Sequence, residues 1–543
     1  MTNSYFKVRK PENEKVLSYE PGSKERIEIK KKLKELKSKQ IEIPLIIGGE
    51  EVKTGNIGTC VMPHNKNHVL ATYHRATKKE VEMAIKASLE AKRKWDEMSY
   101  EHRASIFLKA AELLSGPFRS TINASTMLCQ SKTVFQAEID SACELIDFLR
   151  YNAYYMTDLY NEGADSSNIS WNRMEYRPLE GFIFAVTPFN FTSIAANLPT
   201  APAVVGNVVN WKPASASVYS NYFFMKLLQK AGLPKGVINF IPGDGSLISD
   251  VIMKNENFSG IHFTGSTKVF KGMWEKVGKN IKRYKSYPRI VGETGGKDFV
   301  FAHKSAEIDS LVTALIRGAF EYQGQKCSAA SRAYIPESIF PKVKEKLIND
   351  MKTLKMGDVE DFTTFVGAVI DETAFNKIKG YIDYANKSEE AQIICGGEYD
   401  LSKGYFITPT IIETTNPKFK TMEEEIFGPV LTIYVYKDKD FIKTLDICNE
   451  TSDYGLTGGC FALDREAIEK IEKKLYYAAG NFYINDKPTG AVVGKQPFGG
   501  SRNSGTNDKA GSKLNLIRWM NPRVIKENFN PPKDYRYPYM KEE

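Results

Sequence analysis

The chain has 543 residues, of which 42% are hydrophobic and 26% are charged, and its formal net charge is +9. This is the composition of a globular protein long enough for two or three domains. The basic excess is spread out without an arginine-rich tract, which disfavours nucleic-acid binding, and the basic run 30–37 is typical of a solvated helix face.

The N-terminal part of the chain is predicted to be mainly helical. Residues 1–44 are expected to form an extended arm with one short helix, and residues 43–49 a strand followed by a glycine turn. Thr77 and Glu80 form a capping-box pattern, so a helix with a regular apolar stripe is expected to start there. Further helices are expected near 101–115 and 133–160.

From residue 181 onward, apolar runs of strand length alternate with segments of helical pattern. Because these runs are continuous, they predict parallel strands that are covered on both faces. The fold class is therefore α/β, with an open doubly wound sheet of Rossmann type that binds nucleotides at the carboxyl ends of its strands. The predicted strands are 182–186, 208–211, 237–241, 260–264 and 289–292, and the predicted helices are 193–205, 218–231, 246–254 and 267–279.

A second α/β series begins at Asp298. Two other segments, the hydrophilic stretch 160–180 and the Pro-, Asn- and Tyr-rich segment 518–543, cannot form a core of their own and are expected to pack on another surface, such as a neighbouring subunit. The predicted strands of the second series are 299–302, 333–335, 365–370, 392–395 and 481–484.

The cysteines and histidines indicate neither a disulfide framework nor a metal site. There are seven cysteines without a Cys-x-x-Cys pair, and the six histidines show no ligand spacing with them, so a reducing compartment is expected. No stretch approaches the ~20 apolar residues that span a bilayer. With no apolar signal core and with acidic residues in positions 12–20, we expect a soluble, cytoplasmic protein.

Two segments carry most of the chemistry. Glu293 ends an apolar run and precedes a glycine pair, while Cys327 lies about thirty residues later in a Gly/Gln/Ser loop. A thiolate is a strong nucleophile and a carboxylate can activate water, so the pair can form an acyl intermediate and hydrolyse it. Alone, a cysteine is more often a small buried hydrophobe, and a glutamate before glycines is more often part of a turn.

Polar residues also follow several predicted strands. The Asn190 amide could donate to a developing oxyanion, although a loop asparagine more often bonds its own backbone. The Lys212 ammonium could bind a ribose or a phosphate. Gly265 and Ser266 form a strand-to-helix turn whose free N–H groups favour pyrophosphate, but the turn is not Gly-x-Gly-x-x-Gly and is a weak signal alone.

Seven short motifs occur in one order, and together they are highly specific. On these motifs the chain resembles the aldehyde dehydrogenase superfamily from about residue 45 to residue 520. Segments 17–23 and 498–509 and the helix with Glu144 are similar to the branch that oxidises L-glutamate γ-semialdehyde to L-glutamate, the second step of proline degradation. The motifs are Pro188-Phe189-Asn190, Lys212-Pro213, Phe263-Thr264-Gly265-Ser266, Glu293-Thr294-Gly295-Gly296-Lys297, Gly324-Gln325-Lys326-Cys327, Glu425-Ile426-Phe427-Gly428-Pro429 and Pro497-Phe498-Gly499-Gly500.

The resemblance implies a Rossmann-type cofactor domain, an α/β catalytic domain and a small β-flap for oligomerisation. It implies a homodimer or a higher homo-oligomer, a small-molecule substrate, and a mitochondrial matrix location if the chain is eukaryotic. The implied division is an arm at 1–44, an NAD-binding domain at 45–160 and 181–297, a catalytic domain at 298–506, and a flap and tail at 161–180 and 507–543.

The resemblance also implies roles for individual residues. Cys327 attacks the aldehyde as a thiolate of lowered pKa. Asn190 and the Cys327 N–H hold the oxyanion, and Glu293 activates the water that hydrolyses the thioester. The implied NAD contacts are Thr187, Lys212, Gly265, Ser266, Glu425 and Phe427. The implied substrate contacts are Glu144 for the α-ammonium, Gly490 and Ala491 for the α-carboxylate, Phe191 and Phe498 for the aliphatic part, and Ser328.

Several alternatives stay open at this stage. Ser215 stands where many NAD-dependent members carry glutamate, so this loop does not separate NAD from NADP. Glu144 could simply be exposed on its helix. The substrate could be another small aldehyde. The chain could also be a thiol hydrolase that uses Cys327 with Glu293, or a binding protein on an inactive enzyme fold.

Overall fold

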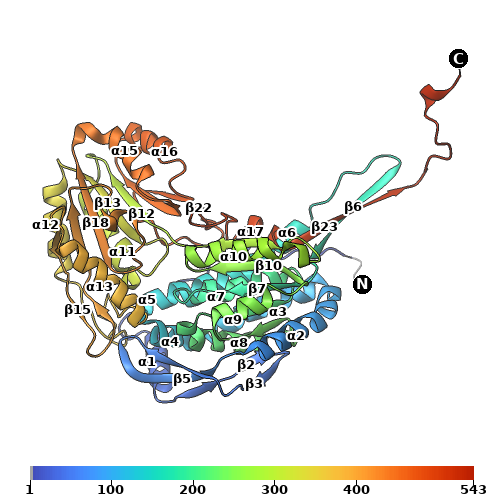
Figure 1. Cartoon of the computed structure of the whole chain (residues 1–543), viewed down its shortest axis with the longest axis horizontal. Helices are drawn as coiled ribbons and strands as arrows, with labels where there is room; N and C mark the ends of the chain where they lie inside the picture. The colour runs from blue at the N-terminus through green and yellow to red at the C-terminus, as the bar shows by residue number, and fades with distance from the viewer. Residues whose placement is uncertain (1–3, 543) are drawn as a thin grey trace.

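A seven-stranded sheet with the order β11-β10-β7-β8-β9-β2-β3 forms the centre of one of the two lobes in this computed structural model, which describes residues 4–542 (Figure 1). Its first five strands are parallel, and β2 pairs antiparallel with β9. From β7 in the middle of the sheet, the chain adds β8 and β9 on one side and then β10 and β11 on the other. This order confirms the predicted Rossmann-type sheet, and the earlier strands β2 and β3 extend it beyond β9. The strands are β2 (Leu45–Ile47), β3 (Glu50–Val52), β7 (Phe182–Val186), β8 (Val209–Lys212), β9 (Ile238–Phe240), β10 (Phe258–Thr264) and β11 (Arg289–Glu293).

The strand register brings the predicted polar residues to one edge of this sheet. Val186, the last residue of β7, lies beside both Lys212 and Phe263. Thr264, the last residue of β10, lies beside Glu293, the last residue of β11. Between β7 and β10 the direction of strand addition reverses, and doubly wound sheets bind their ligands at such a switch point.

Helices cover both faces of this sheet and share one hydrophobic core with it. The capping box at Thr77 is formed as predicted, since the Thr77 amide donates to the Glu80 carboxylate over 3.0 Å. The covering helices are α2 (Lys78–Glu97), α3 (Tyr100–Ser115), α4 (Arg119–Gln130), α6 (Leu145–Tyr160), α7 (Thr192–Val204), α8 (Val218–Ala231), α9 (Gly245–Ile252) and α10 (Thr267–Asn280). Between α5 (Val134–Ala137) and α6 runs one stretch of π-helix, η1 (Glu138–Glu144), a form that often occurs at functional sites.

The second lobe is also built on a seven-stranded sheet, with the order β14-β17-β18-β13-β12-β20-β21. All of its neighbours are parallel except β14, which pairs antiparallel with β17. The strands are β12 (Asp298–Ala302), β13 (Ala330–Pro336), β14 (Ala391–Cys395), β17 (Thr410–Thr414), β18 (Val430–Tyr436), β20 (Thr457–Phe461) and β21 (Asn481–Ile484), and the helices include α11 (Ile308–Phe320), α12 (Phe340–Met351), α13 (Glu372–Asn386), α15 (Phe441–Glu450) and α16 (Arg465–Lys474).

The prediction of a strand at 365–370 is wrong. The segment is buried but joins neither seven-stranded sheet. Its amides bond partners outside these sheets: Ala368 N–H donates to Ser131 Oγ over 3.0 Å and Ile370 N–H to Gln325 Oε1 over 2.9 Å, while other amides of the segment donate to the carbonyl oxygens of Lys355 and Tyr405. The apolar run at 365–370 therefore reflects the burial of this segment and does not indicate strand pairing.

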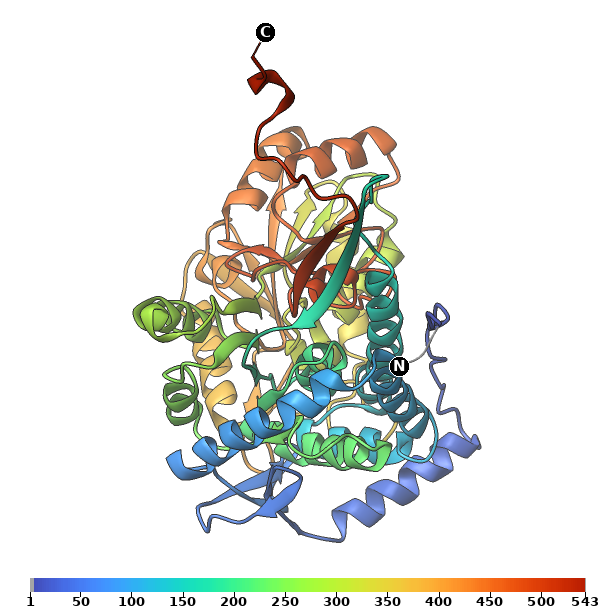
Figure 2. The same cartoon turned by 90° about the vertical axis from the view of Figure 1, so that its right-hand side faces the viewer.

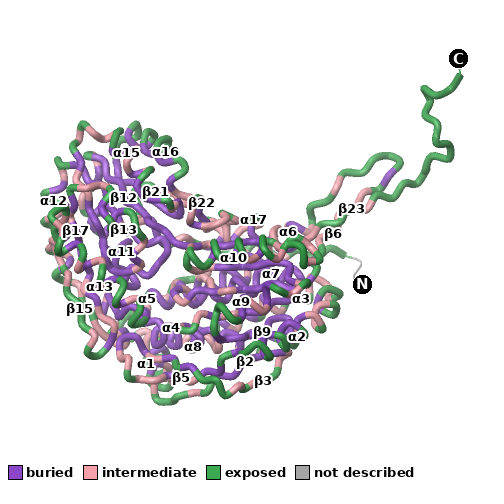
Figure 3. Tube along the Cα trace, in the orientation of Figure 1, coloured by how far each residue is buried: buried purple, intermediate pink, exposed green. Residues whose placement is uncertain are grey.

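A long two-stranded ribbon projects from the first lobe. It consists of β6 (Ser170–Pro178) and β23 (Met520–Asn528), which pair antiparallel from Ser170–Asn528 to Pro178–Met520. Figure 3 shows that residues 529–542, after the ribbon, are exposed, and that the ribbon itself is partly exposed, β23 more than β6. The two segments assigned to a flap and tail are thus paired with each other, while their role in oligomerisation stays a prediction. Among residues 4–542, no helix combines the length and the apolar composition that crossing a membrane requires.

The N-terminal arm is extended up to α1 (Lys24–Lys37) and lies against the helices of the first lobe (Figure 2). One attachment of the arm is Glu138, the first residue of η1, whose carboxylate accepts hydrogen bonds from Tyr19 Oη (2.8 Å) and from the Leu17 N–H (2.9 Å). The same carboxylate pairs with Arg119 and accepts from Asn123 Nδ2 (2.8 Å). One buried carboxylate therefore joins the arm to the π-helix.

This arrangement predicts that Glu138→Ala destabilises the protein. The change removes one of the two carboxylates that pair with the buried Arg119 guanidinium, the other being that of Glu14, and the acceptor for two arm donors, which should cost about 2 kcal/mol of unfolding free energy. Differential scanning fluorimetry should show a clearly lower unfolding midpoint, and proteolysis should cleave the arm faster. The matched control is Glu20→Ala, an exposed residue of the same arm. Equal midpoints for both variants would show that Glu138 does not hold the arm.

Candidate active site

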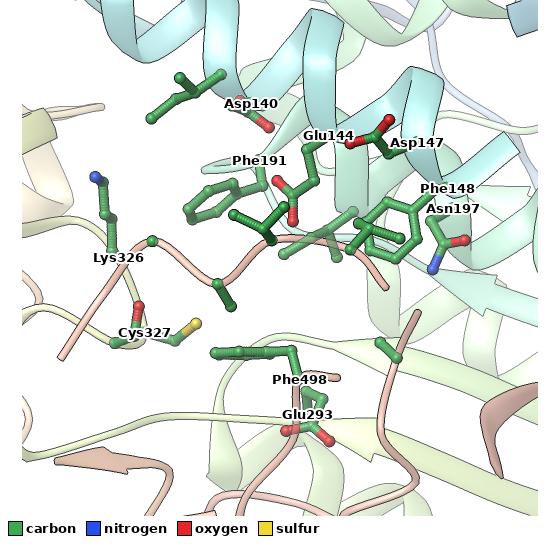
Figure 4. A pocket seen from close by; sticks show the side chains of 18 of the residues that line it. Asp140, Glu144, Asp147, Phe148, Phe191, Asn197, Glu293, Lys326, Cys327 and Phe498 are labelled. Carbon is green, nitrogen blue, oxygen red and sulfur yellow. The ribbon is translucent and has the colours of Figure 1, made fainter. Parts of the chain in front are cut away.

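A cavity of about 380 Å³ lies between the lobes, and both Cys327 and Glu293 line it. This volume is within the range of small-molecule sites. Figure 4 shows the Cys327 sulfur pointing into the cavity, the Glu144 carboxylate entering it from a helix, and the rings of Phe191 and Phe498 on either side. All six predicted substrate contacts line this cavity, namely Glu144, Phe191, Ser328, Gly490, Ala491 and Phe498.

The loop before Cys327 has an unusual backbone. Tyr322, Gln323 and Gly324 follow α11 with φ values of 51°, 56° and 65°, a left-handed conformation that non-glycine residues seldom adopt. A Cβ at Gly324 would collide with the carbonyl oxygen of Gly428, so glycine is required there. Strained backbone of this kind often occurs at functional sites.

The expectation that the site lowers the pKa of Cys327 is contradicted by the surroundings of the thiol. Burial raises the pKa of the Cys327 thiol well above its usual range, and nearby carboxylates, first that of Asp298, raise it further. The neighbouring cation does not offset this effect, because Lys326 Nζ is paired with the Glu321 carboxylate over 3.1 Å. The thiol therefore needs a base to lose its proton near neutral pH.

The Glu293 carboxylate is suited to that task. It stands at the end of β11, where Gly500 N–H donates to it over 3.3 Å. Burial raises the pKa of Glu293 well above its usual range, and the Gly500 hydrogen bond and the Lys509 charge oppose this only in part. A carboxylate of raised pKa is a stronger base.

The Asn190 side chain lies against the Cys327 loop. Its Nδ2 donates to the carbonyl oxygen of Gln325 over 3.0 Å, two residues before the cysteine. Asn190 itself is not among the residues that line the cavity. The structure thus brings the amide to the nucleophile loop, with its donor group engaged by the backbone there.

Glu144 is not an exposed helical residue. It is the last residue of η1, is partly buried, and accepts a hydrogen bond from Ser193 Oγ over 2.8 Å. Burial, followed by the charge of Asp140, raises the pKa of Glu144 to about 8. The alternative that this side chain faces solvent is therefore wrong.

The loop that carries Gly490 and Ala491 is attached directly to the nucleophile loop. Ser328 Oγ, next to the cysteine, donates to Thr489 Oγ1 over 3.0 Å. Gly490 has φ of 102°, a value that favours glycine and that turns the backbone at the cavity wall. A ligand held by the backbone of this loop would be fixed relative to Cys327.

The six predicted cofactor residues do not line the cavity. Four of them lie at or just after the carboxyl ends of β7, β8 and β10 in the first sheet. On the sheet side, Thr187 Oγ1 accepts from Trp211 Nε1 (3.0 Å), and Ser266 Oγ caps α10 just after Gly265. Burial lowers the pKa of Lys212, which stands at the end of β8 near the start of α9.

The second lobe supplies the other two predicted cofactor residues. The Glu425 carboxylate accepts from Gly296 N–H over 2.9 Å. A Cβ at Gly295 would lie 2.5 Å from the same carboxylate, so the chain passes very close there. Phe427 has φ of 62°, and its ring packs edge-on against Phe189 with 5.9 Å between ring centroids.

The sequence analysis missed the contribution of the N-terminal arm to the cavity wall. Asn13 Nδ2 donates to both Asp147 Oδ2 and the carbonyl oxygen of Val493, each over 2.8 Å. Asp147 follows Glu144 by three residues, so helical spacing could have indicated it. No local pattern could have indicated Asn13. Other unpredicted residues of the wall include Glu14, Asp140, Phe148, Asn197, Lys487 and Thr489.

Comparison with known proteins agrees with this geometry. The model of the aldehyde dehydrogenase family matches residues 52–525. A mitochondrial delta-1-pyrroline-5-carboxylate dehydrogenase of Dictyostelium discoideum is 53% identical over 98% of this chain and 96% of its own length, and the Homo sapiens protein of the same name is 47% identical over 97% and 94%.

Solved structures give the same result. The Mycobacterium tuberculosis delta-pyrroline-5-carboxylate dehydrogenase bound with NAD has a TM-score of 0.97 and 48% identity and covers 100% of both chains. A Thermus 1-pyrroline-5-carboxylate dehydrogenase with bound NAD has a TM-score of 0.91 and 32% identity, covering 96% of this chain and 100% of that one. The chain therefore belongs to the aldehyde dehydrogenase family.

Proposed function

We propose that the protein oxidises L-glutamate γ-semialdehyde, the open-chain form of Δ1-pyrroline-5-carboxylate, to L-glutamate with NAD, as the second step of proline degradation. One observation carries this proposal: a single cavity joins Cys327 and Glu293 to Glu144 and to the Gly490–Ala491 loop. The cavity thus offers a nucleophile and a base beside groups suited to an α-ammonium and an α-carboxylate. The relatives at 47–53% identity are named for this activity.

The nucleophile acts first. Glu293 accepts the proton of the Cys327 thiol, and the sulfur attacks the aldehyde carbon to form a thiohemiacetal. The Asn190 amide and the Cys327 N–H donate to the oxyanion that develops, in a site from which most water is excluded. NAD, when bound, supplies the hydride acceptor. Loss of a hydride from the thiohemiacetal carbon leaves a thioester on Cys327. Glu293 releases the thiol proton to solvent and then takes a proton from water, which attacks the thioester; cleavage of the C–S bond frees the acid and restores Cys327.

The far end of the cavity selects the substrate. Glu144 accepts hydrogen bonds from the α-ammonium, and the backbone N–H groups of Gly490 and Ala491 bind the α-carboxylate. Phe191 and Phe498 cover the aliphatic carbons between the two ends. A simple aldehyde such as propanal fills none of the polar positions, and an unpaired buried polar group is costly, so the cavity favours the amino acid semialdehyde.

The residues at the sheet edge fit a dinucleotide. The start of α10 at Gly265 and Ser266 presents free N–H groups to a pyrophosphate. In this proposal Lys212 would hold the adenosine ribose, Glu425 the nicotinamide ribose and Phe427 the nicotinamide end, while Thr187 would contribute a backbone contact. The two structural relatives with bound NAD support NAD as the cofactor.

Assembly and compartment extend the same proposal. The exposed ribbon of β6 and β23 carries large apolar side chains such as Trp171 and Val524, which suits pairing with a second copy in a homodimer or a higher homo-oligomer. The cytoplasm is the predicted compartment. The mitochondrial matrix remains the alternative, since the Dictyostelium and human relatives are named mitochondrial.

Removing the nucleophile or the base should give different results. Cys327→Ala should lower kcat by at least ~10³-fold, because no covalent intermediate can form. Glu293→Gln should slow acyl transfer, because the thiol loses its base, and should block hydrolysis, so that NADH appears in one slow burst and a glutamyl adduct on Cys327 is seen by intact-protein mass spectrometry. Binding of NAD, followed by fluorescence, should be unchanged in both. Full activity of Cys327→Ala would refute the covalent mechanism.

Replacing Glu144 should affect the amino acid substrate selectively. Glu144→Gln removes a charged acceptor for the α-ammonium, a loss worth on the order of 10- to 100-fold in kcat/KM for glutamate semialdehyde. Activity toward propanal, which lacks the ammonium, should change little. A marked preference of the unmodified protein for propanal would contradict the proposed substrate.

The reactivity of Cys327 should depend on pH in a defined direction. Because burial raises the thiol pKa, the thiolate fraction is small near pH 7 and grows as pH increases. The rate of alkylation by iodoacetamide in the cofactor-free protein should thus still be rising above the ordinary thiol pKa of about 8.5. Cys327→Ser gives the background from other thiols, such as the partly buried Cys395. A plateau below pH 8 would show an activated thiolate instead.

A further inference from the structure

A chain of buried polar groups lies behind Glu144. Lys132 and Asp140 form an ion pair in which each side chain is only 1% exposed. The Asp140 carboxylate also accepts the backbone N–H groups of Thr192 (3.2 Å) and Ser193 (3.1 Å), the first residues of α7. Lys132 Nζ is 4.4 Å from the ring centroid of Phe191, which lines the substrate cavity. Asp140 therefore orders the helix start that carries part of the cavity wall.

The Ser193 hydroxyl links this ion pair to Glu144. Its oxygen is 2.7 Å from Asp140 Oδ1 and 2.8 Å from Glu144 Oε2, so it lies between two carboxylates. A hydroxyl has one proton to donate and cannot serve both acceptors at once. When the proton goes to Asp140, the second short contact requires a proton on Glu144 itself.

The surroundings of Glu144 favour the same state. Figure 4 shows Asp140 and Glu144 projecting from the same stretch of helix. The low-polarity cavity and the Asp140 charge both disfavour a second carboxylate anion there, and the Lys132 charge, already paired, opposes them only in part. The other charged groups on the cavity wall are Asp147 of α6, Glu14 of the arm, Glu293 of β11, Glu321 and Lys326 of the nucleophile loop, and Lys487 of the Gly490 loop.

We propose that Asp140 and Ser193 are positioning residues with opposite effects: Asp140 keeps Glu144 neutral in the empty cavity, and the Ser193 hydroxyl stabilises the Glu144 carboxylate that forms when an α-ammonium group binds. This inference rests on the proposed role of Glu144 in amine recognition. On binding, the Glu144 carboxylic acid loses its proton to solvent and the resulting carboxylate pairs with the ammonium. Asp140 keeps Lys132 and two backbone donors, so the Ser193 hydroxyl can turn from Asp140 to Glu144. Amine binding is thereby coupled to the release of one proton.

The coupling has a definite direction with pH. Below the Glu144 pKa of about 8, ammonium binding must first ionise Glu144, so glutamate affinity rises with pH by up to ~10-fold per unit and then levels off. Glutarate, which lacks the amino group, binds the neutral form and should weaken as Glu144 ionises. The ratio of the two affinities should therefore increase with pH.

The test is isothermal titration calorimetry of the full chain with glutamate and with glutarate, in buffers of different ionisation enthalpy, across the Glu144 pKa. Glutamate binding near pH 7 should release close to one proton, and glutarate binding should release none. Glu144→Gln should abolish the release. Ser193→Ala removes a donor to the Glu144 carboxylate and should move the midpoint of glutamate affinity to higher pH. Asp140→Asn removes the like charge and should move it to lower pH.

The outcomes separate this inference from the proposed function. If the unmodified protein binds glutarate as well as glutamate at every pH, Glu144 does not recognise an amine, and both proposals fail. If glutamate is preferred but no proton is released, or Ser193→Ala weakens both ligands equally without moving the midpoint, the two residues have only a structural role and this inference alone fails. Should Asp140→Asn not fold, Ser193→Ala still decides.

Discussion

The register of the parallel strands in the first sheet is the constraint on which the site depends. Glu293 can face the cavity only because β11 ends level with β10, and the last third of the chain then secures that end. Thr506 N–H donates to the carbonyl oxygen of Gly292 over 2.9 Å, and Glu293 forms a bridge with Gly505. Backbone contacts on two sides therefore hold Glu293. Cys327 lies on a strained loop that belongs to the other lobe.

Low polarity in the cavity has one effect on every ionisable group involved in the proposed chemistry. Burial raises the pKa of Cys327, of Glu293 and of Glu144, although the three side chains have different roles. A raised pKa makes Glu293 a better base, and it leaves Cys327 dependent on that base. The raised pKa of Glu144 means that this side chain becomes charged when a cation binds beside it. The exclusion of water from the cavity therefore sets the protonation state of all three side chains.

Much of the site could be predicted from sequence because its residues lie in short contiguous motifs at strand ends. The first sheet was also predictable, because continuous apolar runs there are true parallel strands. The run 365–370 has the same pattern, but its amides bond partners outside the sheets, such as Gln325, which no local pattern reveals. Strand β20 (Thr457–Phe461) was missed, since its two glycines weaken the strand signal. The Cys327 pKa depended on Lys326 being paired elsewhere, which only the fold decides.

The arm that closes one wall of the cavity has a consequence for how the protein is made. Asn13 bonds the carbonyl oxygen of Val493, a partner 480 residues further along the chain. During synthesis on the ribosome, the arm emerges first but cannot take its final place until nearly all of the polypeptide has followed. The strands of both seven-stranded sheets are synthesised before Val493, so the sheets can form first. The substrate cavity is therefore completed only after Val493 has been synthesised.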